Sequence, residues 1–295
     1  MSLHVIEEKA SNMRLDQALC HTFPDHSRAY FQSLIERKAV QVNGKMLKKR
    51  ERVTAGDTIE IEFLEDLPLA AKAEDIPLKI LYEDPAILVV NKPVGMVVHP
   101  APGAPNGTLV NAVLHHLGNI ETCDDPLRPG IVHRLDKDTS GVIVIAKNRR
   151  VHQNIAEQFA NRTVLKEYLA VTISRPQQMH MTSSIGRHPV NRQKMTLLDE
   201  GRQSETIFEI EKQKGDLFLI RARPRTGRTH QIRVHAKASG APILGDPLYG
   251  STAANKKYRE TTQLLHSQSL TITHPVTGDP ITFKTPVPAR FSKYF

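Results

Sequence analysis

Hydrophobic positions in the first seventy residues follow two different periods. At 14–19 and 27–35 they recur at helical spacing, which predicts two short helices. At 40–42 and 58–63 they alternate with polar positions, which is typical of strands. The first of these strands runs into Asn43-Gly44, a strong signal for a hairpin turn. The pattern predicts one compact module of two helices and a basic hairpin.

The rest of the chain contains many short runs of apolar and β-branched residues. These runs predict strands at 80–83, 87–91, 142–146, 167–171, 206–210 and 218–223. Helical spacing predicts helices at 109–117, 152–160 and 229–238, the last with Thr229 as its N-cap. Because strands dominate and helices come at irregular intervals, we expect an α+β domain. Its sheet should be mixed but mostly antiparallel, with helices beside it.

A stretch without clear periodicity separates these two parts. Residues 66–77 contain two prolines and are typical of a linker. We therefore expect a small domain over 1–65 and a large domain over 78–295. The length of 295 residues is consistent with two domains.

Charge and composition narrow the class of protein. The chain has 40 Lys and Arg against 31 Asp and Glu, a formal net charge of +9. Clustered cations displace counterions from phosphates, so this excess indicates a polyanionic partner. No apolar run approaches the roughly 18 residues of a membrane-spanning helix, and the polar N-terminus is unlike a signal peptide. We expect a cytoplasmic protein that is not bound to a membrane.

The densest cluster of polar residues is the loop 133–141, directly before the strand predicted at 142–146. Two carboxylates in this loop, Asp136 and Asp138, flank Lys137. Such a group could form an acid–base pair, a metal site or a salt-bridged turn, and the spacing alone leaves all three open. A loop that ends on a buried strand can hold a reactive side chain on a rigid frame.

A second cluster surrounds the helix predicted at 229–238. Arg225 and Arg228 next to its N-terminus form a corner suited to phosphate. His230 and His235 are five residues apart with no acidic residue between them, which argues against a zinc-hydrolase helix, and we treat both as structural. The chain has no glycine-rich nucleotide-binding motif and no serine-hydrolase elbow. We expect neither a metal nor a cofactor.

These clusters, taken in order, resemble the pseudouridine synthases of the RluA/RluD type, and the first module resembles the S4 RNA-binding domain over 13–63. The segments that carry the first resemblance are 89–100, 133–141, 162–168, 186–189, 226–235, 245–250, 265–266 and 274–275. Two segments depart from the family pattern: 172–184 lacks the usual glycine-rich lead, and 201–206 has Arg and Ser where Lys and Ala are commoner. Neither departure involves the expected catalytic positions.

The resemblance implies an isomerase that replaces the N1–ribose bond of a uridine in RNA by a C5–ribose bond. Asp136 matches the essential aspartate, Arg233 the arginine that pairs with it, and Tyr168 the tyrosine that stacks on the uracil and helps to remove the C5 proton. Two routes stay open: reaction of the carboxylate at the ribose, and reaction at the uracil ring. The target base must leave the helix before it can react.

Further residues are expected to hold the RNA. Arg134, Arg228 and His133 are predicted to bind the target nucleotide, with Arg134 at the vacated position or the backbone. Phosphate contacts of the first module are predicted at Arg28, Lys45, Lys48, Lys49 and Arg50, although a charge run can equally be a solvated face. The implied substrate is large-subunit (23S) ribosomal RNA or its precursor, with transfer RNA as the second possibility. No obligate protein partner is implied.

Two other functions compete with this interpretation. A non-catalytic RNA-binding or ribosome-assembly protein would use the first module together with an inactive synthase fold. A nucleoside or glycoside hydrolase would use Asp136 and Asp138 as its paired carboxylates. We expect Asp138 to be structural instead, capping the turn or pairing with Lys137 or Arg134.

Overall fold

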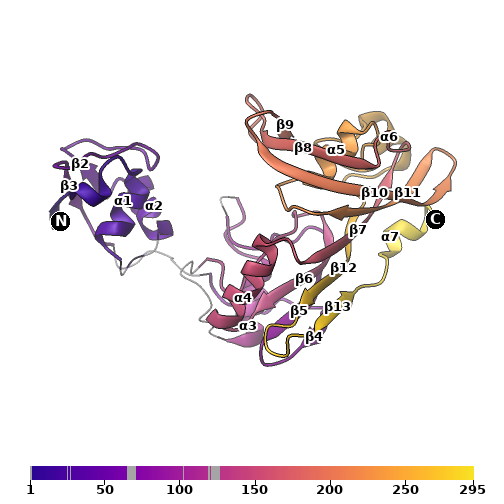
Figure 1. The fold of residues 1–295 in the computed structure, drawn as a ribbon, viewed down its shortest axis with the longest axis horizontal. Coiled ribbons are helices and arrows are strands. Elements are labelled where there is room, and N and C mark those ends of the chain that lie inside the picture. Colours follow the sequence, from indigo (N-terminus) through magenta and orange to yellow (C-terminus); the bar gives the residue numbers. More distant parts are fainter. Residues whose placement is uncertain are drawn as a thin grey trace. The chain divides into compact units, whose positions relative to one another are not determined.

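The computed structural model describes residues 2–24, 26, 28–64, 71–101, 103–118, 120 and 127–295. They form two compact units (Figure 1). The first unit contains the described residues up to Ala71 together with 127–129, and the second contains the others. The end of the predicted linker lies in the second unit, because the Lys72 carbonyl accepts a hydrogen bond from the Asn111 side chain at 2.6 Å.

The first unit packs two helices against a small antiparallel sheet. Its elements are β1 (Ser2–Val5), a 3-10 helix (Glu8–Ala10), α1 (Leu15–Thr22), α2 (Arg28–Glu36), β2 (Val40–Val42) and β3 (Thr58–Ile61). The strands lie in the order β1-β3-β2. Fully buried side chains from both helices and from β3, among them Leu19, Phe31 and Ile59, form its core.

The predicted basic hairpin is only partly present. Asn43 and Gly44 form the expected tight turn, with φ angles of 50° and 72°, and Val42 pairs with Lys45 across it. The chain then leaves the sheet, and β2 pairs with β3 instead. Cations at 48–50 interrupt the alternation that a core-facing strand needs, whereas Ile59 and Ile61 of β3 are buried.

The second unit is built on one large sheet. Among the described residues its strands are β4 (Ile80–Glu83), β5 (Ile87–Lys92), β6 (Ser140–Ala146), β7 (Leu165–Thr172), β8 (His180–Arg187), β9 (Met195–Leu197), β10 (Arg202–Lys214), β11 (Leu217–Pro224), β12 (Leu265–Thr273) and β13 (Pro280–Lys284). The order is β4-β5-β6-β12-β7-β11-β10-β8-β9, and β13 pairs with β12. Neighbouring strands are antiparallel, except that β6 and β12 are parallel. The predicted mostly antiparallel mixed sheet is confirmed.

Helices lie beside both halves of this sheet (Figure 1). They are α3 (Leu109–Leu117), α4 (Arg149–Ala160), α5 (Gln231–Ala238), α6 (Thr252–Tyr258) and α7 (Ala289–Ser292). Helix α4 contacts β6 and β12, and α5 contacts β9, β10 and β11. Within the described part of the chain, no helix is long and apolar enough to cross a membrane.

The central strands β5 and β6 are buried in the middle of the second unit. Every residue of β6 is buried, as are Ile87, Leu88, Val89 and Val90 of β5. The parallel pairing places Gly141 of β6 against Ser267 of β12. Gly141 has a φ of 119°, and a Cβ there would lie 2.6 Å from the Ser267 nitrogen, so only glycine fits. The loop before β6 is therefore joined closely to the middle of the sheet.

Candidate active site

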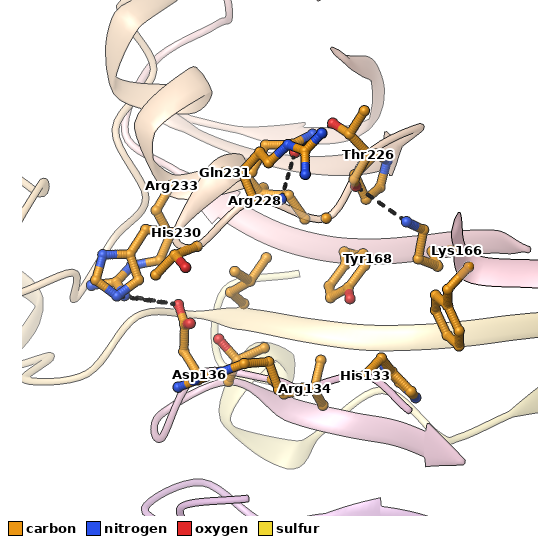
Figure 2. Close-up of a pocket in the computed structure, with 18 of the residues that line it drawn as sticks. His133, Arg134, Asp136, Lys166, Tyr168, Thr226, Arg228, His230, Gln231 and Arg233 are labelled. Atoms are coloured by element: carbon orange, nitrogen blue, oxygen red, sulfur yellow. Dashed lines mark hydrogen bonds and ion pairs between the residues drawn. The ribbon is translucent and has the colours of Figure 1, made fainter. Parts of the chain in front are cut away.

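A cavity of about 360 Å³ opens where two loops face each other. One loop precedes β6, and the other joins β11 to α5. Side chains of β7 and of the end of α4 close the cavity between them. The structure brings the following predicted site residues of the second unit to this cavity: His133, Arg134, Asp136, Tyr168, Arg228 and Arg233 (Figure 2).

A buried lysine holds the loop that carries Asp136. Lys92 at the end of β5 is 0% exposed. Its ammonium group donates to the carbonyls of Pro93, Met96 and Lys137 at 2.9, 2.8 and 3.0 Å. Burial lowers its pKa to about 8, although the charges of Asp136 and Asp138 act in the opposite direction. These three hydrogen bonds connect the loop to the end of β5. The sequence analysis did not assign this role to Lys92.

Asp136 is paired with Arg233, as the resemblance implied. Its Oδ2 accepts a hydrogen bond from Arg233 at 2.9 Å, and its side chain is 21% exposed toward the cavity. No other hydrogen bond to this carboxylate is formed within the described residues. One carboxylate oxygen therefore faces the cavity free to contact a ligand.

Arg233 has a second carboxylate partner that the sequence interpretation missed. Asp246, fully buried, accepts from the Nε and a terminal nitrogen of Arg233 at 2.6 and 2.9 Å, which is a bidentate pair. Burial acts to lower the pKa of Arg233, but the hydrogen bonds and charge of Asp246, together with Asp136, raise it above the ordinary value. Asp246 orients the guanidinium, and Arg233 in turn orients Asp136.

His230, which the sequence analysis treated as structural, lies beside this ion pair and lines the cavity. Its Nε2 is 4.0 Å from Oδ2 of Asp136, and its Nδ1 is 2.9 Å from the Tyr249 hydroxyl. That hydroxyl accepts from the Met195 N–H at 2.7 Å and is buried, so its own proton finds an acceptor in Nδ1. The proton of the neutral imidazole then lies on Nε2, toward Asp136. Burial lowers the pKa of His230, while the charge of Asp136 opposes this shift.

The predicted N-cap at Thr229 is wrong. Helix α5 begins at Gln231, and its N-cap is His230 in a left-handed conformation with φ 56°. The Gln231 side chain organises the preceding loop, because its Oε1 accepts from the Thr226 hydroxyl at 2.6 Å and from the Arg228 N–H at 3.0 Å. These contacts turn His230 toward the cavity at the cost of an unfavourable backbone angle.

His235 has the structural role predicted for it. It is 0% exposed, and its two ring nitrogens lie 2.9 Å from Thr206 and 3.0 Å from Ser204. Ser204, one of the departures from the family pattern, also donates to the Ser183 carbonyl at 2.6 Å. This network fixes α5 to β8 and β10, away from the cavity.

The opposite end of the cavity is formed by Tyr168 and Lys166 (Figure 2). Burial raises the pKa of Tyr168 to about 12, although a hydrogen bond with Ser267 opposes this. Lys166 donates to the Thr226 carbonyl at 3.1 Å, and burial lowers its pKa to about 8. This end of the cavity thus offers an aromatic ring and one cation.

Three other predicted residues have different surroundings. His133 stacks on Phe159 with ring centroids 4.6 Å apart, and its Nε2 accepts from Val144 N–H at 3.1 Å. Burial lowers its pKa to about 3, so it is a neutral wall of the cavity. Arg134 is exposed at the cavity. Asp138 pairs with neither Lys137 nor Arg134 within the described residues; the nearby charge that it influences is that of buried Lys92.

The predicted RNA contacts of the first unit divide into two groups. Arg28 donates to buried Asp16 at 2.8 Å, and Lys49 pairs with Glu36 at 2.6 Å. Three other cations are exposed and form no ion pair with the described residues: Lys45, Lys48 and Arg50. Only the second group presents wholly unpaired charge.

Comparisons with known proteins agree with the geometry. A family model for RNA pseudouridylate synthase matches residues 86–238, and one for the S4 domain matches 13–59. The chain is 39% identical to an uncharacterized RNA pseudouridine synthase of Synechocystis sp., over 98% of this chain and 90% of that protein. It is 38% identical to ribosomal large subunit pseudouridine synthase D of Salmonella typhimurium, over 96% and 90%.

Solved structures give the same result. The human RNA pseudouridylate synthase domain containing 1 has a TM-score of 0.60 and 26% identity, and the match covers 75% of this chain and 87% of that one. The matched family segment runs from β5 to α5 and contains both loops of the cavity. The chain belongs to the RNA pseudouridylate synthase family of isomerases.

Proposed function

We propose that this enzyme converts a uridine of large-subunit ribosomal RNA to pseudouridine in the cavity around Asp136. The N1–C1′ bond breaks, a C5–C1′ bond forms, and the proton on C5 is lost as N1 gains one, so no atom is added overall. The observation that carries the proposal is the pairing of Asp136 with a doubly held Arg233 in a cavity that leaves one carboxylate oxygen free.

In this proposal Asp136 reacts as a carboxylate. The guanidinium of Arg233 lies 2.9 Å from its Oδ2 and holds it in place. Arginine suits this role because it stays charged and its fork fixes the orientation of the carboxylate. Attack at C1′ and attack at the uracil ring both begin from this ionised oxygen.

Tyr168 acts as a stacking surface in this proposal. With a pKa of about 12 its hydroxyl keeps its proton at neutral pH in the protein without RNA. Its ring lies in the cavity between Asp136 and Lys166 (Figure 2). Aromatic rings bind bases of any sequence through their faces.

The target base must be flipped into the cavity. A volume of about 360 Å³ is within the range of small-ligand pockets, about 300–1,000 Å³. It accommodates one nucleotide and not a duplex, so the base has to leave its stack, which costs roughly a few kcal/mol. Exposed Arg134 at the cavity is suited to hold the vacated position or the adjacent backbone.

Large-subunit ribosomal RNA is the proposed substrate because the names of several relatives refer to the large ribosomal subunit. Ribosomal large subunit pseudouridine synthases D from Salmonella typhimurium and Xanthomonas campestris are 38% and 37% identical to this chain. An S4 domain at residues 13–59 supplies a second RNA-binding unit.

The test is incubation of purified protein, without added cofactor, with transcripts of large-subunit ribosomal RNA and of transfer RNAs. Pseudouridine-specific chemical labelling should detect product at discrete positions of the ribosomal transcript. Product in transfer RNA alone would refute the proposed substrate. Release of free uracil would indicate hydrolysis instead of isomerisation.

A further inference from the structure

Arginines of the second unit fall into two groups by their partners. Arg221 and Arg223 in the middle of β11 pair with carboxylates of neighbouring strands, for example with Glu167 at 2.8 Å each. Arg162, Arg202 and Arg228 have no carboxylate within 4.0 Å among the described residues. Paired arginines are accounted for by the fold. Arg162, Arg202 and Arg228 are three of several arginines whose charge is left unneutralised within the described residues, and they are distinguished by their position beside the cavity.

The three unpaired arginines share one rim of the cavity. Arg228 lines the cavity, and its Nε donates to the Gln203 carbonyl at 3.1 Å, next to Arg202. Arg162 follows the end of α4, two residues after Ala160, which also lines the cavity. Burial and then the charges of Arg202 and Arg162 lower the pKa of Arg228, so each of these two arginines repels Arg228 in the free protein. An anion bound between them would remove that repulsion.

The backbone at Arg162 gives an independent indication. Its N–H donates to the Phe159 carbonyl and the Thr163 N–H to the Gln158 carbonyl, which is the Schellman ending of a helix. Arg162 occupies the left-handed position of this motif, with φ 60°, where glycine is preferred. A positive charge near a helix C-terminus stabilises the helix. A lysine or arginine inside the last turn would provide that charge without adopting the left-handed backbone conformation. A glycine would therefore serve this helix end at least as well as the arginine.

We propose that Arg162, Arg202 and Arg228 form a phosphate-binding site for the RNA backbone next to the nucleotide in the cavity. The site rests on the proposed function, since it presumes that RNA enters the cavity. Guanidinium groups bind phosphate oxygens through two parallel hydrogen bonds, and three of them on one rim suit successive phosphodiesters. Arg202 and Arg228 are fixed by β10 and the loop before α5, and Arg162 by the end of α4.

The test uses Arg162→Gly and Arg202→Gln in the full-length protein. The matched control is Arg259→Gly, because Arg259 is also exposed and left-handed (φ 55°) but lines no part of this cavity. The probe is a transcript of large-subunit ribosomal RNA at 50–200 mM salt. Three quantities are measured: Kd, its salt dependence, and the rate of pseudouridine formation at saturating enzyme.

Arg162→Gly should melt at the same or a higher temperature than wild type and yet bind RNA about three- to tenfold more weakly. The slope of log K against log salt should fall by about 0.7–0.9 for each arginine removed. The saturating rate should stay within about twofold of wild type, because these contacts bind the backbone and not the reacting base. Arg259→Gly should change neither Kd nor slope.

Two results would overturn the inference: wild-type affinity in Arg162→Gly and Arg202→Gln, or an equal loss in Arg259→Gly. Absence of pseudouridine from the wild-type reaction would refute the proposed function instead. Binding and product are measured separately, so these failures can be told apart.

Discussion

Each unit of the protein contains a buried cluster of aspartate and arginine, but the excess charge is of opposite sign. In the first unit Asp16, fully buried, accepts from Arg14, Arg28 and Gln32 at 2.7–3.0 Å. In the second unit Arg233 is shared by Asp246 and Asp136. The first cluster has one guanidinium in excess and the second has one carboxylate in excess.

This difference separates a carboxylate whose oxygens are all bound from one that is free to contact a ligand. Both oxygens of Asp16 are occupied, and partly exposed Arg14 and Arg28 carry the surplus positive charge. Within the described residues Asp136 receives a single hydrogen bond, at 2.9 Å, and Asp246 binds the other two nitrogens of Arg233. The same pairing chemistry thus anchors α1 to α2 in one unit and presents an oriented, half-free carboxylate in the other.

The largest effect is expected from Asp136→Asn. The amide keeps the shape and the contact with Arg233 but cannot act as an anion, so single-turnover pseudouridine formation should fall by about 10³-fold or more. The melting temperature should stay within about 2 °C of wild type, because Asp136 is not part of the buried core. A large drop in melting temperature would show that Asp136 is structural, as Asp16 is.

Asp246→Asn should reduce both rate and stability. It breaks a fully buried ion pair, which costs about 3–5 kcal/mol of unfolding free energy, and it frees Arg233 to move away from Asp136. We expect about a 10²-fold lower single-turnover rate. Urea unfolding measures the first effect, and Asp199→Asn, an exposed aspartate, is the control. A normal rate in Asp246→Asn would mean that Asp136 needs no oriented arginine.

Lys92→Met should have a smaller effect of the same kind. It leaves the carbonyls of Pro93, Met96 and Lys137 without their shared donor and loosens the loop that carries Asp136. A loss of about 1–3 kcal/mol of stability and a rate about tenfold lower are expected. If stability falls while the saturating rate is unchanged, Lys92 supports the fold only.

Tyr249→Phe should lower the rate about three- to tenfold, because His230 loses the hydrogen bond that fixes its tautomer. Burial keeps the pKa of His230 below its ordinary value of 6.5, so the wild-type rate should be flat from pH 6.5 to 7.5. It should decline below that range as His230 gains a proton and competes with Arg233 for Asp136. A wild-type rate that already declines above pH 6.5 as the pH falls would contradict the lowered pKa and remove His230 from this account.

The smallest effect on the rate is expected from Asp16→Asn. Hydrogen bonds from Arg28, Gln32 and Arg14 outweigh burial and hold the pKa of Asp16 below 3.8. Its contribution to stability is therefore complete above pH 3.8 and is lost as the pH falls through the lower folded-state value. The variant should destabilise the first unit at neutral pH, measured by hydrogen exchange of 2–24 and 28–64, with an unchanged rate at saturating enzyme.

Long periodic segments and local motifs could be predicted from the sequence. The helix expected at 109–117 is α3 at those residues, and the strand expected at 80–83 is β4. Strand β12 was missed because buried His266, Ser267 and Ser269 break its apolar pattern. Their polar groups are tolerated because they form hydrogen bonds: Ser140 bonds His266 at 2.8 Å, and Ser267 and Ser269 donate to the Val142 carbonyl and to Glu167 at 3.2 Å each.

The site was predictable only for residues to which the resemblance assigns a role, and not for every residue within the family motifs. Asp136, Arg233 and Tyr168 were identified by resemblance, and the structure places all three at one cavity. Asp246 and Lys92 were not assigned roles, because their functions depend on contacts between segments far apart in the chain. A lysine is ordinarily exposed, and no local pattern marks one that meets three carbonyls.

The most direct test compares Asp136→Asn with Asp138→Asn in one assay. Both carboxylates lie in the same loop, but only Asp136 contacts Arg233. Pseudouridine-specific labelling of large-subunit ribosomal RNA, after incubation with each variant, measures the product. The account predicts no detectable product with Asp136→Asn and product within a few-fold of wild type with Asp138→Asn. Normal product with Asp136→Asn and none with Asp138→Asn would contradict it.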